Sequence, residues 1–145
     1  MDDFNTYIVL DEGVKLPEYK TKGSAAFDLC ANESVEIMPN ETKLIDTGIR
    51  MSVPKGMYLQ ISLRSGLAAK GKFIQPNAPG VIDSDYTGKI KLIIRNVNST
   101  VQKIEKGDRI AQAILLPTYK CIFKIVDKLK ETERGEGGFG STGHK

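Results

Sequence analysis

Hydrophobic residues recur at every second position in several short segments of the chain. These segments are Ile45 to Val53, Met57 to Leu63, Ile90 to Ile94 and Cys121 to Ile125. Alternation with period two predicts β-strands that each have one buried face. Turn-forming sequences rich in Pro, Gly, Asn and Asp separate these segments, at 38–41, 53–56, 75–80, 96–99 and 106–108. Short strands at intervals of roughly 8–12 residues are typical of a β-sandwich or β-barrel.

Four further segments place polar residues within this framework. One short helix is expected from Ser65 to Lys70, with Ser65 as its N-cap. Asp28 lies in a segment that otherwise has the character of a buried strand. Residues 80–88 predict a hairpin-like excursion between two glycines. Arg109 and Gln112 are three positions apart, so in a regular strand they would face opposite sides of the sheet.

Length and composition restrict the class of protein. A chain of 145 residues predicts one domain, which we divide into a β domain at 1–133 and a Gly-rich tail of that domain at 134–145. The net charge is only +3 and the basic residues are spread along the chain, so we expect no stable nucleic-acid binding. No apolar run approaches the ~20 residues of a membrane span, and we expect no membrane association.

The N-terminus and the cysteines indicate the compartment. The start Met-Asp-Asp-Phe-Asn is acidic and unlike a signal peptide. Cys30 and Cys121 lack metal-ligand spacing, and we expect two buried free thiols in a reducing environment. These features favour a cytoplasmic protein, or a nuclear one in a eukaryote, or one that acts in the host cell if the source is viral.

The tail carries the strongest chemical signal. Five glycines at 135–143 expose backbone N–H groups that can approach phosphate oxygens closely. Arg134 adds a bidentate cation, Ser141 and Thr142 add hydroxyls, and Phe139 offers a ring that can stack on a base. The segment matches G-x-G-x-x-G, but the chain ends five residues later, which excludes a dinucleotide-binding helix, and no Lys precedes Ser141 as a Walker motif requires. By itself, this tail is equally compatible with a nucleotide-binding flap and with a disordered terminus.

Two other segments could contribute to such a site. Arg64, Ser65 and Gly66 begin the expected helix, where free N–H groups attract anions, although a simple capped turn has the same residues. Asp83 follows an apolar pair and could deprotonate a water, with Tyr86 packed against a sugar. Asp83 and Asp85 could also be a Mg²⁺ pair, although their spacing needs no metal to explain it, or could only shape the turn.

In order along the chain, these segments resemble the five motifs of the trimeric deoxyuridine triphosphatases. Four of them are distinctive: Arg64-Ser-Gly-Leu-Ala68, Gly80-Val-Ile-Asp-Ser-Asp-Tyr-Thr-Gly88, Gly107-Asp-Arg-Ile-Ala-Gln112 and Arg134-Gly-Glu-Gly-Gly-Phe-Gly-Ser-Thr-Gly143. The resemblance runs from Ala25 to Gly143. It implies a jelly-roll-like β-barrel or sandwich with one short helix, assembled as a homotrimer. It also implies Mg²⁺-dependent hydrolysis of dUTP to dUMP and pyrophosphate, which limits uracil in DNA and supplies dUMP for dTMP synthesis.

The resemblance assigns the phosphate side of the site to three motifs. Asp28 corresponds to the aspartate that holds Mg²⁺ through water, and the rest of the metal shell comes from the substrate triphosphate. Arg64, Ser65 and Gly66 correspond to the phosphate-binding motif. Gln112 corresponds to a phosphate and water ligand.

The uracil side and the tail are assigned in the same way. Asp83 corresponds to the carboxylate that activates the attacking water, and Tyr86 to the ring beneath the deoxyribose. Asn77, Gly80 and Ile82 lie where the family reads the uracil edge. The closing tail would place Phe139 over the uracil and the remaining residues on the phosphates, namely Arg134, Gly140, Ser141 and Thr142. Each site would combine three subunits.

Two motifs depart from the family pattern, at three positions. Ala26 and Phe27 stand where Gly and Tyr are usual, which changes the backbone around Asp28. Lys89 stands where Glu is common, at a position that we expect to face outward. Two other functions remain as alternatives. A dCTP deaminase shares the fold, but residues 77–88 contain no Glu for its chemistry. The second alternative is a regulator on this fold that binds a protein partner and is controlled by its nucleotide state.

Overall fold

The computed structural model describes residues 4–139 and has a nearly all-β fold with one short helix, as predicted. Its strands and helix are, in chain order, β1 (Ile8–Leu10), β2 (Phe27–Cys30), β3 (Val35–Ile37), β4 (Thr42–Asp46), β5 (Ile49–Met51), β6 (Met57–Leu63), α1 (Ser65–Ala68), β7 (Phe73–Ile74), β8 (Gly80–Ile82), β9 (Lys91–Asn96), β10 (Gln102–Ile104) and β11 (Arg109–Pro117).

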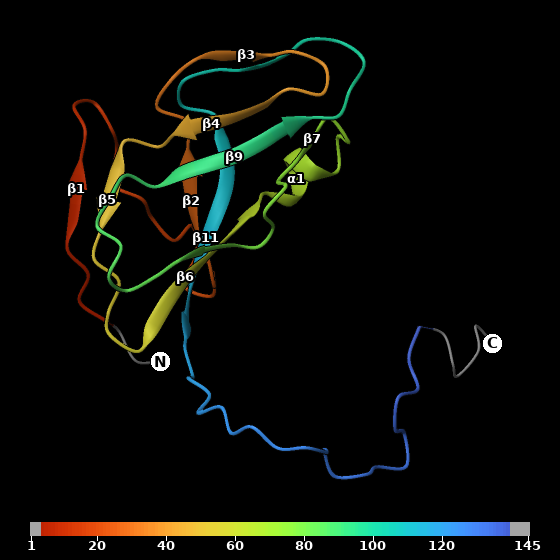
Figure 1. The fold of residues 1–145 in the computed structure, drawn as a ribbon. Coiled ribbons are helices and arrows are strands. Elements are labelled where there is room, and N and C mark those ends of the chain that lie inside the picture. The colour runs from red at the N-terminus through yellow and green to blue at the C-terminus, as the bar shows by residue number, and fades with distance from the viewer. Residues whose placement is uncertain (1–3, 140–145) are drawn as a thin grey trace.

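Two antiparallel sheets form the body of the molecule (Figure 1). One has the strand order β2-β11-β6-β8, and the other has the order β4-β9-β7. Two-stranded pairs, β1 with β5 and β3 with β10, complete the fold. The inner faces of both sheets contribute to a single hydrophobic core, whose largest fully buried apolar side chains are Leu29, Ile37, Ile45, Leu59, Ile90, Ile94, Ile104 and Ile110. Alternate residues of each strand therefore face this core, and the others remain available for a site.

The alternating segment from Ile45 to Val53 is divided into two strands. Gly48 has a φ of +67°, a conformation that favours glycine, and its N–H donates to Oδ1 of Asp46 at 2.8 Å. A Cβ at this position would lie 2.6 Å from Val14, so the close packing also requires glycine. Because of this turn, β4 pairs with β9 in one sheet, whereas β5 pairs with β1. The hydrophobic alternation continues through the turn, which is why the pattern alone predicted one strand.

The helix is shorter than predicted, and its N-cap is a different residue. It spans Ser65–Ala68, and the N-cap is Arg64, with no side-chain cap hydrogen bond. The prediction that Ser65 is the N-cap is wrong by one position, because Arg64 retains the extended backbone of β6 (φ −65°, ψ 141°) and the helical turn begins after it. Ser65 is instead the first helical residue.

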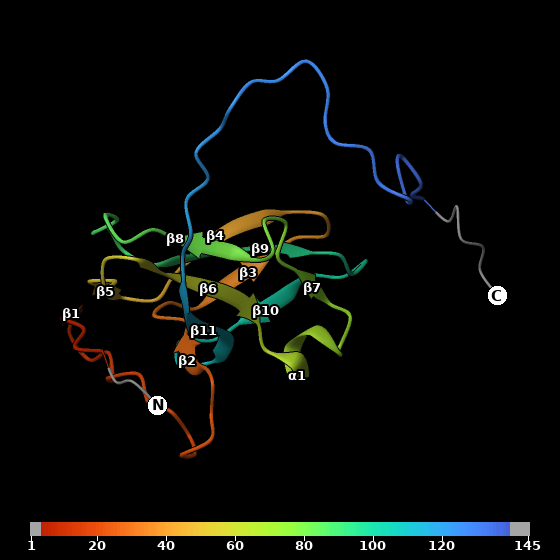
Figure 2. The same ribbon diagram turned by 90° about the horizontal axis from the view of Figure 1, so that it is seen from below.

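Beyond Pro117 the chain leaves the body as an extended arm (Figures 1 and 2). The predicted strand at Cys121–Ile125 is wrong for the described chain, since no strand follows β11 up to residue 139. The arm has no neighbouring strand to pair with its N–H and C=O groups, and Phe123 and Ile125 are fully exposed. Both cysteines are free as predicted, but neither is fully buried: Cys30 is half-buried and Cys121 is exposed on the arm. Within residues 4–139, no helix has the length and apolar character needed to cross a membrane.

Candidate functional site

Asp28 lies at the centre of a charged cluster on β2. Arg64 Nε contacts Oδ1 of Asp28 at 2.9 Å, and Arg109 Nη1 contacts Oδ2 at 3.3 Å. Only 15% of the Asp28 side chain is exposed. Because Phe27 and Leu29 face the core, alternation turns Asp28 to the opposite face of the sheet. The cluster therefore carries two guanidinium groups for one carboxylate, a net positive charge suited to an anion.

Gln112 lies on the same face as this cluster. In the register of the sheet it is opposite Asp28 on one side and Ser62 on the other, and its Nε2 is 3.5 Å from Ser62 Oγ. Arg109 is opposite Cys30, and the register with β2 shifts between Arg109 and Ala111. This bulge adds one residue to β11, so the expectation that Arg109 and Gln112 face opposite sides is wrong.

The start of α1 extends the charged cluster. Ser65 and Gly66 directly follow Arg64, and both are exposed. A Cβ added to Gly66 would meet no other atom within 4 Å, so the space beside it is open. Cys30 also adjoins the cluster, and its pKa is raised by burial first and by the negative charge of Asp28 second. The Cys30 thiol is therefore protonated at neutral pH. Arg64, Ser65, Gly66, Gln112 and Asp28, which were predicted to bind phosphate and metal, thus lie on or beside one polar face.

The residues predicted to bind uracil and sugar occupy a different edge of the sheet. Asn77, Asp83 and Tyr86 are exposed, whereas Ile82 is half-buried against the core. The predicted hairpin between Gly80 and Gly88 is wrong: β8 pairs with β6, and β9 pairs with β4 and β7. The segment is instead a crossing from one sheet to the other. A tight turn in it is closed by the Tyr86 N–H, which donates to the Asp83 carbonyl at 3.2 Å.

Gln75 supports this segment and was not identified from the sequence. Its Nε2 donates to the carbonyl of Ile61 on β6 at 3.2 Å, and its Oε1 is a buried side-chain oxygen without a partner in the described residues. A Cβ on Gly80 would approach Gln75 Nε2 to 3.0 Å, so the buried Gly80 has little room for a side chain. Gln75 thereby holds the start of β8 against β6. Its position before Pro76 gave no signal, because a lone Gln in a turn is ordinary.

Within one chain, the phosphate-side residues and Asp83 lie far apart. The strands β11 and β6 separate β2 from β8, so β2 and β8 are about 14 Å apart at the usual strand spacing. Along the strands, Ile82 pairs with Leu59, whereas Gln112 pairs with Ser62, which is three residues further on. That offset adds about 10 Å. A single chain therefore does not place Asp83 beside Asp28 and Gln112.

The described part of the tail also lies away from β2, β11 and α1, the elements that carry the polar face (Figure 2). Arg134 Nε donates to the carbonyl of Gly137 at 2.8 Å, within the tail itself. Phe139 has a positive φ of 49° and a fully exposed side chain. The other predicted tail residues, Gly140, Ser141 and Thr142, lie outside the described residues. Neither Arg134 nor Phe139 contributes to the Asp28 cluster of its own chain.

The side chain of Lys89 does not face outward, contrary to the expectation from the sequence. The side chain is half-buried, and Nζ donates to Asp11 Oδ2 and, at 2.9 Å, to Asp46 Oδ2. These two hydrogen bonds raise the pKa of Lys89, and the bond to Asp11 has the larger effect. Burial alone would raise the pKa of Asp46, but hydrogen bonds from Lys89 and the Gly48 N–H lower it overall. Lys89 precedes β9, so the alternation of that strand does not determine its orientation.

The lowered pKa of Asp46 predicts a specific loss of stability in acid. The unfolded chain, with its Asp pKa near 3.9, takes up this proton at a higher pH than the native protein does. As pH falls through that range, the contribution of Asp46 to the free energy of unfolding is therefore lost. We expect Asp46→Asn to flatten the fall in Tm between about pH 5 and pH 3. The exposed Asp127→Asn variant is the control, and an equal acid dependence in Asp46→Asn and the wild type would contradict the prediction.

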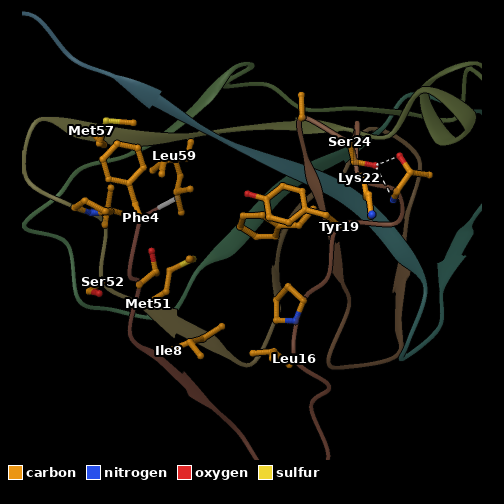
Figure 3. Close-up of a pocket in the computed structure, with 18 of the residues that line it drawn as sticks. Phe4, Ile8, Leu16, Tyr19, Lys22, Ser24, Met51, Ser52, Met57 and Leu59 are labelled. Atoms are coloured by element: carbon orange, nitrogen blue, oxygen red, sulfur yellow. Dashed lines mark hydrogen bonds between the residues drawn. The ribbon is translucent and has the colours of Figure 1, made fainter. Parts of the chain in front are cut away.

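A large apolar cleft lies apart from these polar groups (Figure 3). Its volume is about 750 Å³, and it lies between the N-terminal segment and the sheet. Figure 3 shows Phe4, Met57 and Leu59 toward one end of the cleft and Tyr19 with Lys22 toward the other. Tyr19 packs edge-on against Phe27, with ring centroids 5.7 Å apart. None of the described residues predicted to bind substrate lines this cleft, and its apolar lining does not suit a triphosphate.

Comparison with known proteins identifies the family. The dUTPase family model matches residues 12–143. The chain belongs to the dUTPase family. Among its relatives, the deoxyuridine 5'-triphosphate nucleotidohydrolase of Treponema denticola is 47% identical over 136 residues, which are 92% of this chain and 94% of the relative. The enzyme of the same name from Dinoroseobacter shibae is 44% identical over 140 residues, or 92% and 90% of the two chains.

Solved dUTPase structures share the fold. A mutant dUTPase of Staphylococcus bacteriophage 80alpha with dUpNHpp superposes with a TM-score of 0.87, covering 96% of this chain and 98% of that one at 27% identity. A mutant dUTPase of phage phi11, 23% identical, superposes with a TM-score of 0.77, covering 86% of this chain and 98% of that one. The phi11 structure is described as revealing the coordination of a structural Mg(II) ion. The nearly all-β fold with one helix is thus that of the dUTPases.

The polar face fits a magnesium ion that the substrate carries. In the described part of the chain, no three His, Cys, Asp or Glu side chains form a metal-binding group. Mg²⁺ in nucleotide enzymes commonly uses one or two carboxylates together with phosphate oxygens and waters. Asp28, which is next to Gln112 and two arginines, would supply one such carboxylate.

Proposed function

We propose that this dUTPase hydrolyses dUTP to dUMP and pyrophosphate with Mg²⁺. The observation that carries the proposal is the family match over residues 12–143, which includes every residue assigned to the site. The polar face around Asp28 supports it independently, because two arginines surround one carboxylate there. Such a face accommodates a triphosphate and its cation far better than a neutral ligand.

The proposed chemistry divides between the two groups of residues. Arg64, Ser65, Gly66 and Gln112 bind the phosphates, and Asp28 binds waters of the magnesium shell. Bound Mg²⁺ supplies neutralisation of the triphosphate charge. Asp83, exposed at its turn, accepts the proton of a water whose oxygen attacks the α-phosphorus. The bond from that phosphorus to the bridging oxygen breaks, and pyrophosphate leaves.

The uracil and the sugar bind at the crossing segment. Asn77 and the backbone at Gly80 and Ile82 read the uracil edge, and Tyr86 lies beneath the deoxyribose. The exposure of Asn77 and Tyr86 supports this role, because both side chains are available to a ligand. Phe139 with the rest of the tail closes over the bound nucleotide and excludes water from the phosphates.

We propose that the functional unit is a homotrimer with shared sites. The estimated separation of Asp83 from the Asp28 cluster supports this arrangement, because a second subunit can bring an Asp83 turn to the cluster. The exposed arm supports it as well, since Phe123, Ile125 and Leu129 are large apolar side chains exposed to solvent. The apolar cleft around Leu16 and Met57 is a second surface that association would cover.

Substrate selectivity tests the proposed function. We expect efficient release of pyrophosphate from dUTP and a kcat/KM for UTP that is lower by at least ~10²-fold, because a ring close beneath the sugar excludes the 2′-hydroxyl. We expect similar rejection of dTTP, whose methyl group the tight crossing segment excludes. The measurement is pyrophosphate release from dUTP, UTP, dTTP and dCTP under identical conditions. Comparable constants for UTP and dUTP would contradict the proposal, and ammonia release from dCTP would favour a deaminase instead.

A further inference from the structure

Lys89 joins three segments that are distant in the sequence. Its Nζ bonds Asp11, which follows β1, and Asp46, which ends β4, while Lys89 itself precedes β9. All three side chains are mostly buried, with 24–28% exposed. Arg50 also reaches Asp11 Oδ1, at 3.4 Å. We call Lys89, Asp11 and Asp46 the Lys89 anchor.

The anchor contacts Tyr86 through the backbone. The Tyr86 hydroxyl donates to the carbonyl oxygen of Lys89 at 2.8 Å. The ring also lies against Gly88, where a Cβ would come within 2.5 Å of the hydroxyl oxygen and 2.7 Å of Cζ. Although 44% of Tyr86 is exposed, its ring is therefore held at two points, and both belong to the segment that Lys89 tethers.

We propose that Lys89 is a positioning residue for sugar selectivity, which acts by fixing the backbone on which Tyr86 rests. This inference rests on the proposed function, in which Tyr86 lies beneath the deoxyribose. Exclusion of one hydroxyl oxygen requires the ring to keep its position closely, and displacement of even ~1 Å is significant at such a site. Lys89 supplies that restraint by holding residues 88 and 89 against β1 and β4.

Loss of the ammonium group would release the restraint. Asp11 and Asp46 would then face the same space as two carboxylates without the cation that joins them, which is unfavourable in a mostly buried setting. The backbone at residue 89 would lose its only side-chain ties to those segments among the described contacts. The Tyr86 ring could then shift away from the sugar, and UTP would be admitted more readily.

The test compares Lys89→Met with a matched control. Methionine keeps the length of the stem and removes the charge. Lys103→Met removes a lysine that pairs with Glu105 at 2.7 Å on the exposed surface of β10, away from Tyr86. In steady-state assays we expect the ratio of kcat/KM for dUTP to that for UTP to fall about 10-fold in Lys89→Met, mainly through a higher kcat/KM for UTP. The control should keep the wild-type ratio, and Lys89→Arg should recover part of it because the cation is retained.

Two further variants separate positioning from a general loss of stability. Tyr86→Phe removes the bond to the Lys89 carbonyl, so the selectivity losses of Tyr86→Phe and Lys89→Met should not add in the double variant. Thermal melting is measured beside the kinetics. A lower Tm in Lys89→Met with an unchanged dUTP/UTP ratio would overturn the inference, as would fully additive losses in the double variant.

The remaining outcomes are also decisive. If Lys89→Met does not fold, Asp46→Asn carries the test: it weakens one side of the anchor, and an unchanged ratio in that variant would overturn the inference. A wild-type enzyme that does not distinguish dUTP from UTP would instead refute the proposed function, and the inference with it. A selective wild type together with selective anchor variants would leave the proposed function intact and refute only the role of Lys89.

Discussion

Replacing Asp83 with asparagine is expected to slow turnover by roughly 10²–10⁴-fold, the usual contribution of a general base. Asparagine preserves the shape of the side chain but cannot accept the proton of the attacking water. The turn should persist, because it is closed by the backbone of Asp83 and not by its side chain: the Tyr86 N–H donates to the Asp83 carbonyl. We therefore expect the loss in kcat, with binding of a non-hydrolysable dUTP analogue retained. Single-turnover kinetics and calorimetry measure the two effects separately.

Asp85→Asn is the matched control for this experiment. Asp85 lies two residues away in the same exposed turn, so its substitution makes the same change in charge. We expect a much smaller loss of turnover in Asp85→Asn, since only Asp83 has the proposed role. Near-normal turnover of Asp83→Asn would move the base elsewhere, and Asp28 would be the first candidate. Equal losses in the two variants would indicate that the turn contributes charge and not a specific base.

The fold class was predictable because most strands bury one face. Met57 to Leu63 and Ile90 to Ile94 alternate as strands of an antiparallel sheet should, and β6 and β9 lie there. The prediction failed where a local contact redirected the chain without changing the hydrophobic pattern. Gly48 turns between β4 and β5 while the alternation continues. The apolar alternation at Cys121–Ile125 forms no strand because the described chain offers no neighbour for it.

The grouping of some candidate residues was predictable where the identity and order of residues carry the signal. Asp28, Arg64 and Gln112 were identified from their motifs, and the structure gathers them on one face. Their geometry was not predictable, because the bulge before Ala111 reverses the facing of Arg109. The ionic contacts of Lys89 were equally hidden, since Asp11 and Asp46 are 78 and 43 positions away in the chain. Period and spacing describe neighbours in sequence, whereas these contacts depend on how the sheets pack.

A second large effect is expected from removing residues 134–145. The β body should fold and assemble, because the deletion leaves every strand found in residues 4–139 and the apolar arm from 118 to 133 in place. Turnover should nevertheless fall by at least about 10²-fold, the cost of losing even one preorganised donor to the developing charge. The described tail residues lie outside the core, and Phe139 is fully exposed. A near-wild-type Tm together with poor kinetics would meet this expectation, and unchanged kinetics would contradict it.

Combining the two lesions tests whether the sites are shared. In the proposed trimer, each site takes its phosphate-binding face from one subunit, Asp83 from a second and the tail from a third. We expect Asp83→Asn trimers and tail-deleted trimers each to be nearly inactive. In a mixed trimer, however, one site in three receives Asp83 from a tail-deleted subunit and the tail from an Asp83→Asn subunit. That site has an intact Asp83 and an intact tail, so it should be active.

The size of the recovery can be stated in advance. Random mixing of equal amounts makes three quarters of the trimers mixed, so about one quarter of all sites, and of wild-type activity, should return under the symmetry of a closed trimer. Native mass spectrometry must show mixed trimers after co-refolding, and each variant refolded alone is the control. If Asp83 and the tail of a site came from the same subunit, every site would keep a lesion and mixing would restore nothing. Mixed trimers without recovered activity would therefore refute the division of the site among three subunits.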